Sequence, residues 1–99
     1  MENVEKKQVL TFEGTVKEVS RMYTHESRYE EGVYFEYRKI RVESEEKYTQ
    51  SAWFTVRSQK LLNFPFEIGS KVRVYYNLKA YRTEYGESTG VSAWDMVAI

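Results

Sequence analysis

Apolar and polar residues alternate with a period of two along most of the chain, which is the pattern of half-buried β-strands. The first such run, 10–20, has Leu10, Phe12 and Val16 in one phase. Gly14 lies in the same phase, and a glycine inside a strand indicates a bulge or a sharp bend. We therefore predict five strands, over 10–20, 33–43, 47–57, 71–81 and 90–99.

Two connections between the predicted strands have distinct sequences. The charged residues 44–46 predict a short hairpin turn between the second and third strands. After the third strand, Ser58 can cap a turn of helix, Leu61 and Leu62 supply an apolar face, and Pro65 ends the helix. The resulting order is three strands, a short helical plug and two strands, which is the order of the OB fold. We therefore expect an all-β, five-stranded OB barrel.

The predicted strands sort their side chains into an apolar interior and an outer surface, because successive residues point to opposite faces. The inward set is Ile40, Val42, Ala52, Phe54, Val56, Val72, Val74 and Leu78. The outward set is Tyr37, Lys39, Arg41, Trp53, Arg57, Arg73, Tyr75, Lys79 and Tyr81. This outward set is aromatic and cationic, and it contains no carboxylate. The phase of Tyr34, Phe35 and Tyr37 stays open, because a bulge would exchange them.

An outer surface of this kind suits single-stranded nucleic acid. Flat rings stack on unpaired bases, and Arg or Lys side chains neutralise the phosphates. The connections that flank the surface add Tyr23, Arg28 and Arg82, and in OB folds these connections grip oligonucleotides. The predicted binding residues are therefore Tyr23, Arg28, Tyr37, Lys39, Arg41, Trp53, Arg57, Arg73, Tyr75, Lys79, Tyr81 and Arg82.

Several of these residues also have a structural interpretation. Trp53 could lie in a dimer interface, and Tyr75 and Tyr81 could be ordinary cross-strand partners on a solvated sheet. The cations on the strands could instead discourage pairing at a strand edge. We expect Trp94 to be structural, because the last strand contributes little to the usual ligand face of such barrels.

The composition excludes several kinds of site. The chain has 15 basic and 15 acidic residues, one histidine and no cysteine, so disulfides, thiolate metal sites and a cysteine nucleophile are excluded. His25 alone cannot form a histidine metal site or a catalytic triad, and adjacent carboxylates such as Glu30 and Glu31 point apart. We therefore expect a non-catalytic protein with no cofactor, no metal and no small-molecule substrate.

The length and hydropathy of the chain indicate its organisation. A chain of 99 residues corresponds to one domain, which we place at 1–99 with a frayed lead-in at 1–7. No apolar run resembles a secretory signal or is long enough to span a bilayer. We therefore expect a cytoplasmic protein with no membrane partner.

Two runs in the second half of the chain, Gln50–Val56 and Phe66–Val72, resemble segments of bacterial or phage single-stranded DNA-binding proteins. The run Gln50–Val56, QSAWFTV, is similar to the family's strand with an outward stacking tryptophan, which the resemblance places at Trp53. The run Phe66–Val72, FEIGSKV, is similar to the start of the family's fourth strand, and Tyr81 falls near its second stacking aromatic. Small uncharacterised OB proteins are similar at 64–66 and 91–94.

The chain departs from that family in two ways. No acidic tail follows Ile99, and the connection at 44–46 is shorter than the family's hairpin. We therefore expect no recruitment of other proteins through such a tail, and a smaller DNA-binding surface.

The outward set and the resemblance together predict a protein that binds single-stranded DNA by stacking and phosphate neutralisation. We expect it to act in replication or recombination as a homodimer or homotetramer. Two alternatives stay open. One is an OB module that binds another protein through its aromatic surface. The other is an RNA binder, which the lack of the aromatic-glycine motifs of cold-shock domains disfavours.

Overall fold

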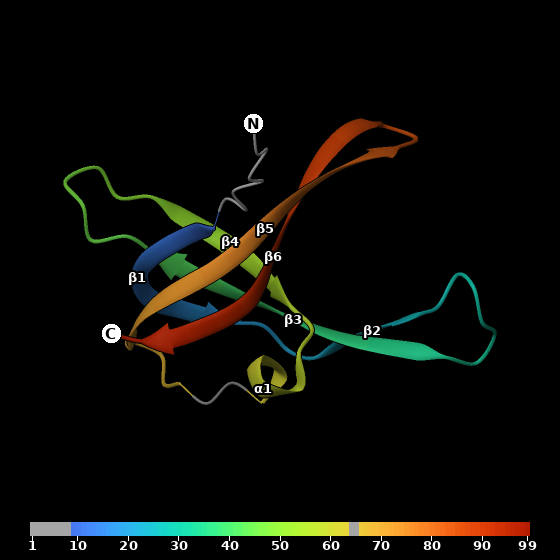
Figure 1. Ribbon diagram of the computed structural model, residues 1–99, viewed down its shortest axis with the longest axis horizontal. Helices are drawn as coiled ribbons and strands as arrows, with labels where there is room; N and C mark the ends of the chain where they lie inside the picture. Colours follow the sequence, from blue (N-terminus) through green and yellow to red (C-terminus); the bar gives the residue numbers. More distant parts are fainter. Residues whose placement is uncertain (1–8, 64–65) are drawn as a thin grey trace, which may run out of the picture.

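The chain folds into a closed and mostly β structure, seen in a computed structural model that describes residues 9–63 and 66–99. In chain order its elements are β1 (Leu10–Val19), β2 (Tyr23–Glu26), β3 (Tyr34–Glu43), β4 (Ser51–Val56), α1 (Gln59–Leu62), β5 (Lys71–Thr83) and β6 (Gly86–Ala98) (Figure 1). The expected lead-in at 1–7 and the expected helix stop at Pro65 lie outside the described residues.

The sheet closes on itself because β1 pairs with two neighbours. The strand order is β1-β5-β6-β4-β3-β2, and β1 also pairs with β3. The pairs are antiparallel except for β4 with β6, where a short parallel register joins Thr55 to Ser92 and Val56 to Ala93. The helix α1 connects β4 to β5 at one end of the barrel (Figure 1). This arrangement places strands and helix in the order of an OB barrel.

Gly14 lies where β1 passes from one neighbour to the other. β1 pairs with β5 from Leu10 to Thr15 and with β3 from Thr15 to Val19. A Cβ atom at Gly14 would collide with the backbone carbonyl oxygen of Glu43. Glycine therefore lets β1 come close to the end of β3, in agreement with the bend expected here from the sequence (Figure 1).

Apolar side chains from five strands and the helix fill the barrel. Ser58 caps α1, because its hydroxyl accepts a hydrogen bond from the Leu61 N–H at 3.4 Å. The Phe54 ring packs between those of Phe12 and Tyr76, at centroid distances of 5.6 and 5.4 Å. The buried apolar residues are Val16, Ile40, Val42, Phe54, Val56, Leu61, Leu62, Val72, Val74, Ala93 and Met96.

Two long hairpins extend from the barrel (Figure 1). One is formed by β2 and β3, and β2 is a strand that the sequence did not predict. The other consists of the far ends of β5 and β6, which are longer than predicted and meet next to Gly86. Leu78 lies on this second hairpin and is 55% exposed, so its predicted inward position is wrong. The phase of Leu78 is correct, but β5 has already left the barrel there.

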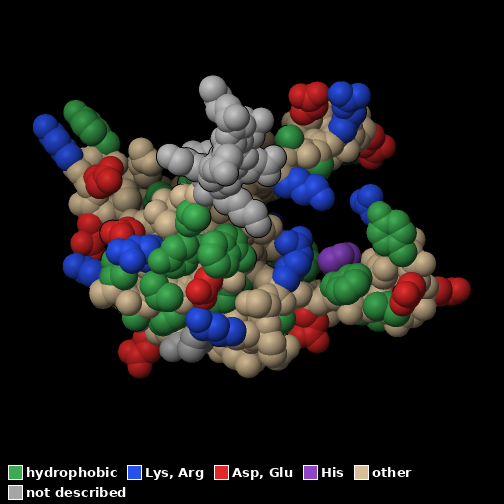
Figure 2. Space-filling view, in the orientation of Figure 1, with side chains coloured by type: hydrophobic (Ala, Val, Ile, Leu, Met, Phe, Trp, Pro, Cys, Tyr) green, Lys and Arg blue, Asp and Glu red, His purple; other side chains and the backbone are tan. Residues whose placement is uncertain are grey.

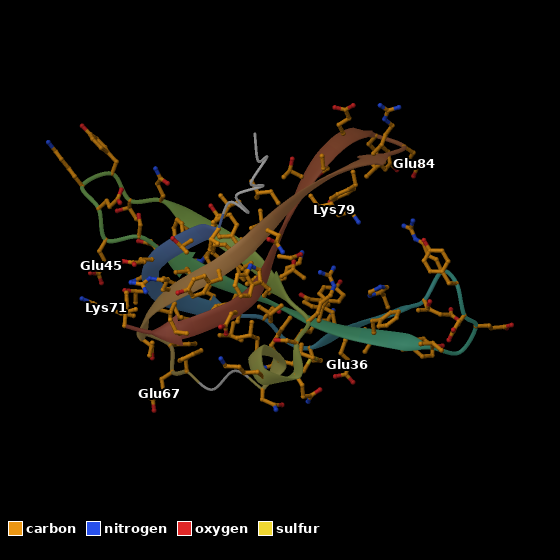
Figure 3. All side chains as sticks on the ribbon, viewed as in Figure 1. Glu36, Glu45, Glu67, Lys71, Lys79 and Glu84 are labelled. Atoms are coloured by element: carbon orange, nitrogen blue, oxygen red, sulfur yellow. The ribbon has the colours of Figure 1, made fainter. Side chains whose placement is uncertain are left out.

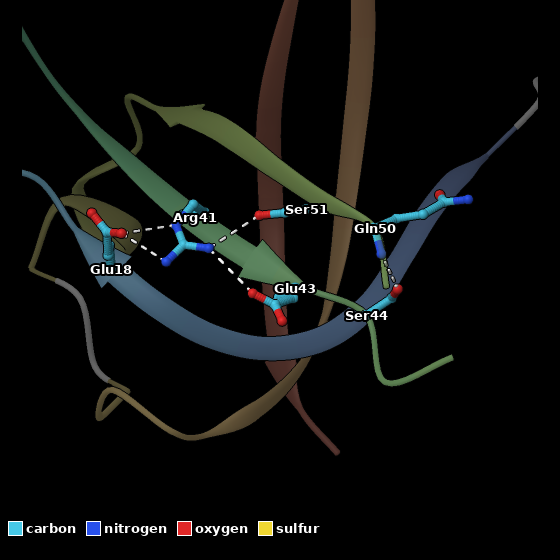
Figure 4. A network of polar contacts seen from close by, with 6 residues as sticks. All are labelled: Glu18, Arg41, Glu43, Ser44, Gln50 and Ser51. Carbon is cyan, nitrogen blue, oxygen red and sulfur yellow. Dashed lines mark hydrogen bonds and ion pairs between the residues drawn. The ribbon is translucent and has the colours of Figure 1, made fainter. Parts of the chain in front are cut away.

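The connection between β3 and β4 is longer than the predicted turn at 44–46. It covers residues 44–50, because β4 begins at Ser51. Ser44 closes the connection: its N–H donates to the Gln50 carbonyl at 2.7 Å, and its hydroxyl accepts from the Gln50 N–H at 2.9 Å (Figure 4). The prediction of a short turn is therefore wrong.

Neither membrane-spanning helices nor metal clusters occur in the described part of the chain. Across residues 9–63 and 66–99, no helix has the length and apolar character needed to cross a bilayer. The same residues contain no group of three or more His, Cys, Asp or Glu side chains placed to hold a metal ion.

Candidate nucleic-acid interface

A groove lies between the two hairpins where they leave the barrel. We call the β2–β3 hairpin the first arm, and the β5–β6 hairpin over residues 77–92 the second arm. Figure 2 shows the hollow between them, bordered by Lys and Arg side chains in blue and by the histidine in purple. Its volume is about 840 Å³. The residues that line the groove are His25, Ser27, Arg28, Tyr29, Phe35, Arg57, Lys79, Tyr81, Arg82, Thr83 and Glu84.

The first arm presents an aromatic face to this groove. Tyr23 pairs with Tyr37 and His25 pairs with Phe35, so the four rings share one face of the two-stranded ribbon. The rings of Tyr23 and Tyr37 stack with centroids 5.3 Å apart and 19° between their planes. His25 contacts Phe35 at 5.6 Å, and the Arg21 guanidinium lies 4.6 Å from the centre of the Tyr23 ring. These contacts hold flat rings at a surface where a base can stack.

The opposite face of the first arm is acidic. Thr24 pairs with Glu36 and Glu26 pairs with Tyr34, and these residues alternate along the strands with the four rings. Figure 3 shows Glu36 pointing away from the groove, whereas Lys79 extends into it from β5. The paired strands of the first arm therefore keep their carboxylates away from the groove.

The groove brings together four cations. Arg28, Arg57 and Lys79 form no ion pair with any residue that the structure describes. Arg82 lies 3.3 Å from Glu87, but both side chains are largely exposed, and ion pairs of that kind are weak. A phosphate chain in the groove could approach these cations without first separating a strong ion pair.

Two of the three predicted cations on the body of the barrel, Arg41 and Arg73, are paired with carboxylates instead. Arg41 lies 2.7 Å from Glu18 and 3.2 Å from Glu43 (Figure 4). Arg73 lies 2.7 Å from Glu13, and the hydrogen bond to Glu13 raises the pKa of the Arg73 guanidinium. The outward set itself contains no carboxylate, but the surface around it is not uniformly cationic, because β1 runs beside β3 and β5 and supplies Glu13 and Glu18.

Three of the predicted aromatic residues, Trp53, Tyr75 and Tyr81, lie at different places on the protein surface, and only Tyr81 lines the groove. Trp53 is 45% exposed and lies opposite Arg41 on the neighbouring strand, outside the groove. Tyr81 is 48% exposed in the groove, and its ring lies so close to Gly90 that a Cβ atom there would be 3.3 Å from Tyr81 Cε1. Tyr75 lies on β5 with its ring 5.2 Å from that of Trp94.

The groove thus divides the predicted binding residues into two groups. Those that line it are Arg28, Arg57, Lys79, Tyr81 and Arg82. Tyr23 and Tyr37 adjoin it on the aromatic face of the first arm. Those that lie elsewhere on the outer surface are Lys39, Arg41, Trp53, Arg73 and Tyr75.

Phe35 is the clearest groove residue that was not predicted as a binding residue. It is 49% exposed and contacts His25. A signal for it was present in the sequence: rings at positions 23 and 25 and at 35 and 37 alternate with polar residues on both sides of a polar stretch. Two such runs facing each other indicate a ribbon with one aromatic face.

Solved structures show where this fold occurs. The chain is similar to the mitochondrial single-stranded DNA binding protein Rim1 of S. cerevisiae, with a TM-score of 0.58 and 18% identity over 93% of this chain and 94% of that one. It is also similar to the small single-stranded DNA-binding protein of Streptomyces coelicolor, with a TM-score of 0.51 and 14% identity over 95% of each chain. No protein-family model and no curated protein sequence matches it. The predicted fold is therefore confirmed: this chain has the OB fold that these single-stranded DNA-binding proteins share.

Proposed function

We propose that this protein binds single-stranded DNA in the groove between its arms and catalyses no reaction on it. The observation that carries the proposal is the juxtaposition of unpaired cations with the aromatic face of the first arm. Arg28, Arg57 and Lys79 supply positive charge, and rings such as Phe35 supply stacking surfaces. A single strand needs both, because it exposes its bases together with its phosphates. The names of the two structural neighbours support the same class of ligand.

The two-sided first arm favours one orientation of the ligand. Phosphates are repelled by Glu26 and Glu36 on the acidic face and attracted by the cations in the groove. In a duplex the bases stack on one another and cannot reach the rings of the arm. The groove is therefore expected to bind a single strand more tightly than a duplex.

We infer that the chain acts as one OB-fold domain in a homodimer or homotetramer. It would cover single strands during DNA replication or recombination in the cytoplasm. Trp53 is exposed outside the groove, where it can serve as a further stacking residue or as a contact between subunits. Loss of DNA binding without loss of the oligomer in a Trp53→Ala variant would select the first role.

The test is a titration with labelled oligo-dT at low and moderate salt, followed by fluorescence anisotropy. Neutralisation of three phosphates predicts that log K falls against log salt with a slope of about −2, since each phosphate on a single strand contributes about −0.7. Absence of binding at low salt would contradict the proposal and favour the protein-binding alternative. A parallel titration with oligo-U tests RNA, because a site that reads the 2′-hydroxyl separates the two ligands.

A further inference from the structure

β6 contains a bulge at Trp94. The register between β5 and β6 passes from Tyr75 opposite Asp95 to Tyr76 opposite Ala93, which leaves Trp94 as an extra residue. Ala93 remains buried, while Trp94 is 51% exposed. The bulge therefore places Trp94 and Asp95 together on the outer surface. Bulges re-aim side chains in this way and are frequent beside functional sites.

Trp94 and Tyr75 form a continuous aromatic surface on the outside of the barrel, which we call the shelf. Their ring centroids are 5.2 Å apart, and their planes meet at 43°. Trp94 is 51% exposed and Tyr75 is partly exposed, so both rings offer aromatic surface to solvent. The shelf is therefore able to accept a base in the same manner as the rings of the first arm.

The negative charge beside the shelf is compensated. Asp95 Oδ1 lies 2.9 Å from Lys60 Nζ and accepts a hydrogen bond from the Met96 N–H at 2.8 Å. The hydrogen bond to Lys60 and then that to Met96 hold the pKa of Asp95 below its usual value. Because the lysine balances the carboxylate, the edge of the shelf does not strongly repel a phosphate.

Arg57 connects the shelf to the groove. The parallel register pairs Thr55 with Ser92 on β4 and β6. Arg57 directly follows the end of β4, two residues after Thr55, and Trp94 lies two residues after Ser92 on β6. Arg57 Nη1 donates a hydrogen bond to Ser92 Oγ at 3.1 Å, so its side chain reaches β6. Since Ala93 is buried between them, Ser92 and Trp94 share the outer face of the strand. Arg57 also lines the groove.

We propose that the shelf of Trp94 and Tyr75 extends the binding site, so that a DNA strand leaving the groove crosses Arg57 and stacks a base on these rings. The inference rests on the proposed function, because the same strand occupies both parts. According to this proposal Trp94 contacts DNA, whereas the sequence alone predicts only a structural role for it. The site then continues from the arms onto the body of the barrel.

The length of the oligonucleotide provides a direct test. A Trp53→Phe variant keeps Trp94 as its single tryptophan. It would be titrated with labelled oligo-dT of about 4 to 16 nucleotides, the range of site sizes of OB folds. Anisotropy of the label reports binding, and tryptophan fluorescence reports contact with Trp94. Short oligonucleotides should bind without quenching, and quenching should begin above a threshold length. Binding at every length without quenching of Trp94 would overturn the proposal.

Substitution of the shelf provides a second test. Trp94→Ala should lower affinity for long oligo-dT about 5- to 150-fold, the equivalent of one lost base stack, and should leave short oligo-dT unaffected. Trp94→Phe should retain most of the affinity. Tyr48→Ala, at an exposed ring on the 44–50 connection, is the matched control and should change neither. If Trp94→Ala and the wild type bound long oligo-dT with equal affinity, the proposal that the shelf binds a base would be overturned.

The two proposals can fail separately. If Lys79→Ala weakens DNA binding and Trp94→Ala does not, the groove binds DNA and the shelf does not. If the wild-type protein binds no oligonucleotide of any length at low salt, the proposed function is wrong, and the shelf proposal is overturned with it.

Discussion

Phe35 and its neighbour Tyr34 lie on opposite faces of the first arm. Phe35 contacts His25 on the side of the groove, at a centroid distance of 5.6 Å, whereas Tyr34 pairs with Glu26 on the acidic side. Both side chains are well exposed, at 49% and 63%. The two residues are therefore a natural pair for comparing the faces of the arm, since they differ in direction more than in size or burial.

Phe35→Ala is expected to weaken binding of oligo-dT by about 1–3 kcal/mol, because it removes a ring on which a base can stack. Tyr34→Ala is expected to leave the affinity unchanged. Anisotropy titrations of both variants, with circular dichroism to verify folding, check the prediction. Equal losses from the two substitutions would mean that the strand does not distinguish the faces of the arm.

Lys79→Ala and Arg57→Ala should each lower the affinity and make the slope of log K against log salt shallower by about 0.7, because each variant loses one phosphate contact. Lys47→Ala removes the same charge from the distant 44–50 connection and should leave the slope unchanged. Arg41→Ala should also leave the slope unchanged, because Arg41 is engaged by Glu18 and Glu43. A shallower slope for Arg41→Ala would place phosphates on the barrel body instead.

Gly14→Ala is expected to destabilise the barrel by more than about 2 kcal/mol, because the new methyl group collides with backbone atoms that cannot rotate away. Thr11→Ala, on the exposed side of the same strand, should change the free energy of unfolding by less than about 1 kcal/mol. Urea denaturation monitored by tryptophan fluorescence compares the two. A Gly14→Ala protein as stable as the wild type would show that β1 does not approach β3 so closely.

Asp95→Asn is expected to reduce stability near neutral pH and to have a smaller effect in acid. The pKa of Asp95 in the folded protein lies below its ordinary value, with the hydrogen bond to Lys60 as the largest cause. Ionised Asp95 therefore contributes its full stabilisation above about pH 5, and this contribution is lost as the pH falls through the folded pKa. Urea denaturation of both proteins at about pH 7 and about pH 3 measures the difference. If the difference in the free energy of unfolding between the wild type and Asp95→Asn were larger at about pH 3 than at about pH 7, the stabilising role of ionised Asp95 would be contradicted.

The barrel could be predicted from the sequence because its strands have one buried face. Residues such as Phe54 and Val56 alternate with polar neighbours, and this alternation gives both the strands and the phase of their side chains. The cap at Ser58 and the buried Leu61 were equally visible. The arms were harder to predict, because neither face of β2 is buried, and its rings alternate with polar residues in a region without a core. Leu78 illustrates the same limit of the sequence pattern. The alternation gives the face of β5 on which Leu78 lies, but it does not show at which residue β5 leaves the barrel.

The binding residues could be named from the sequence more readily than they could be assembled into a site. Arg28, Arg57, Lys79 and Arg82 were predicted individually, but their convergence depends on the paths of two hairpins. The pairing of Arg73 was hidden because Glu13 lies 60 positions away in the chain. Charge on a strand face could therefore be predicted, but its neutralisation by a neighbouring strand required the three-dimensional structure.

The parallel contact between β4 and β6 consists of only Thr55 with Ser92 and Val56 with Ala93. So short a seam makes the junction of these strands the most easily parted side of the barrel, since the antiparallel hairpins on either side can stay intact when it opens. A nucleic acid strand that contacts both Arg57, next to β4, and Trp94, on β6, would link the two strands across that seam. Bound nucleic acid would then oppose local separation of β4 and β6. The backbone amides at the seam would exchange their hydrogens more slowly in the complex than in the free protein.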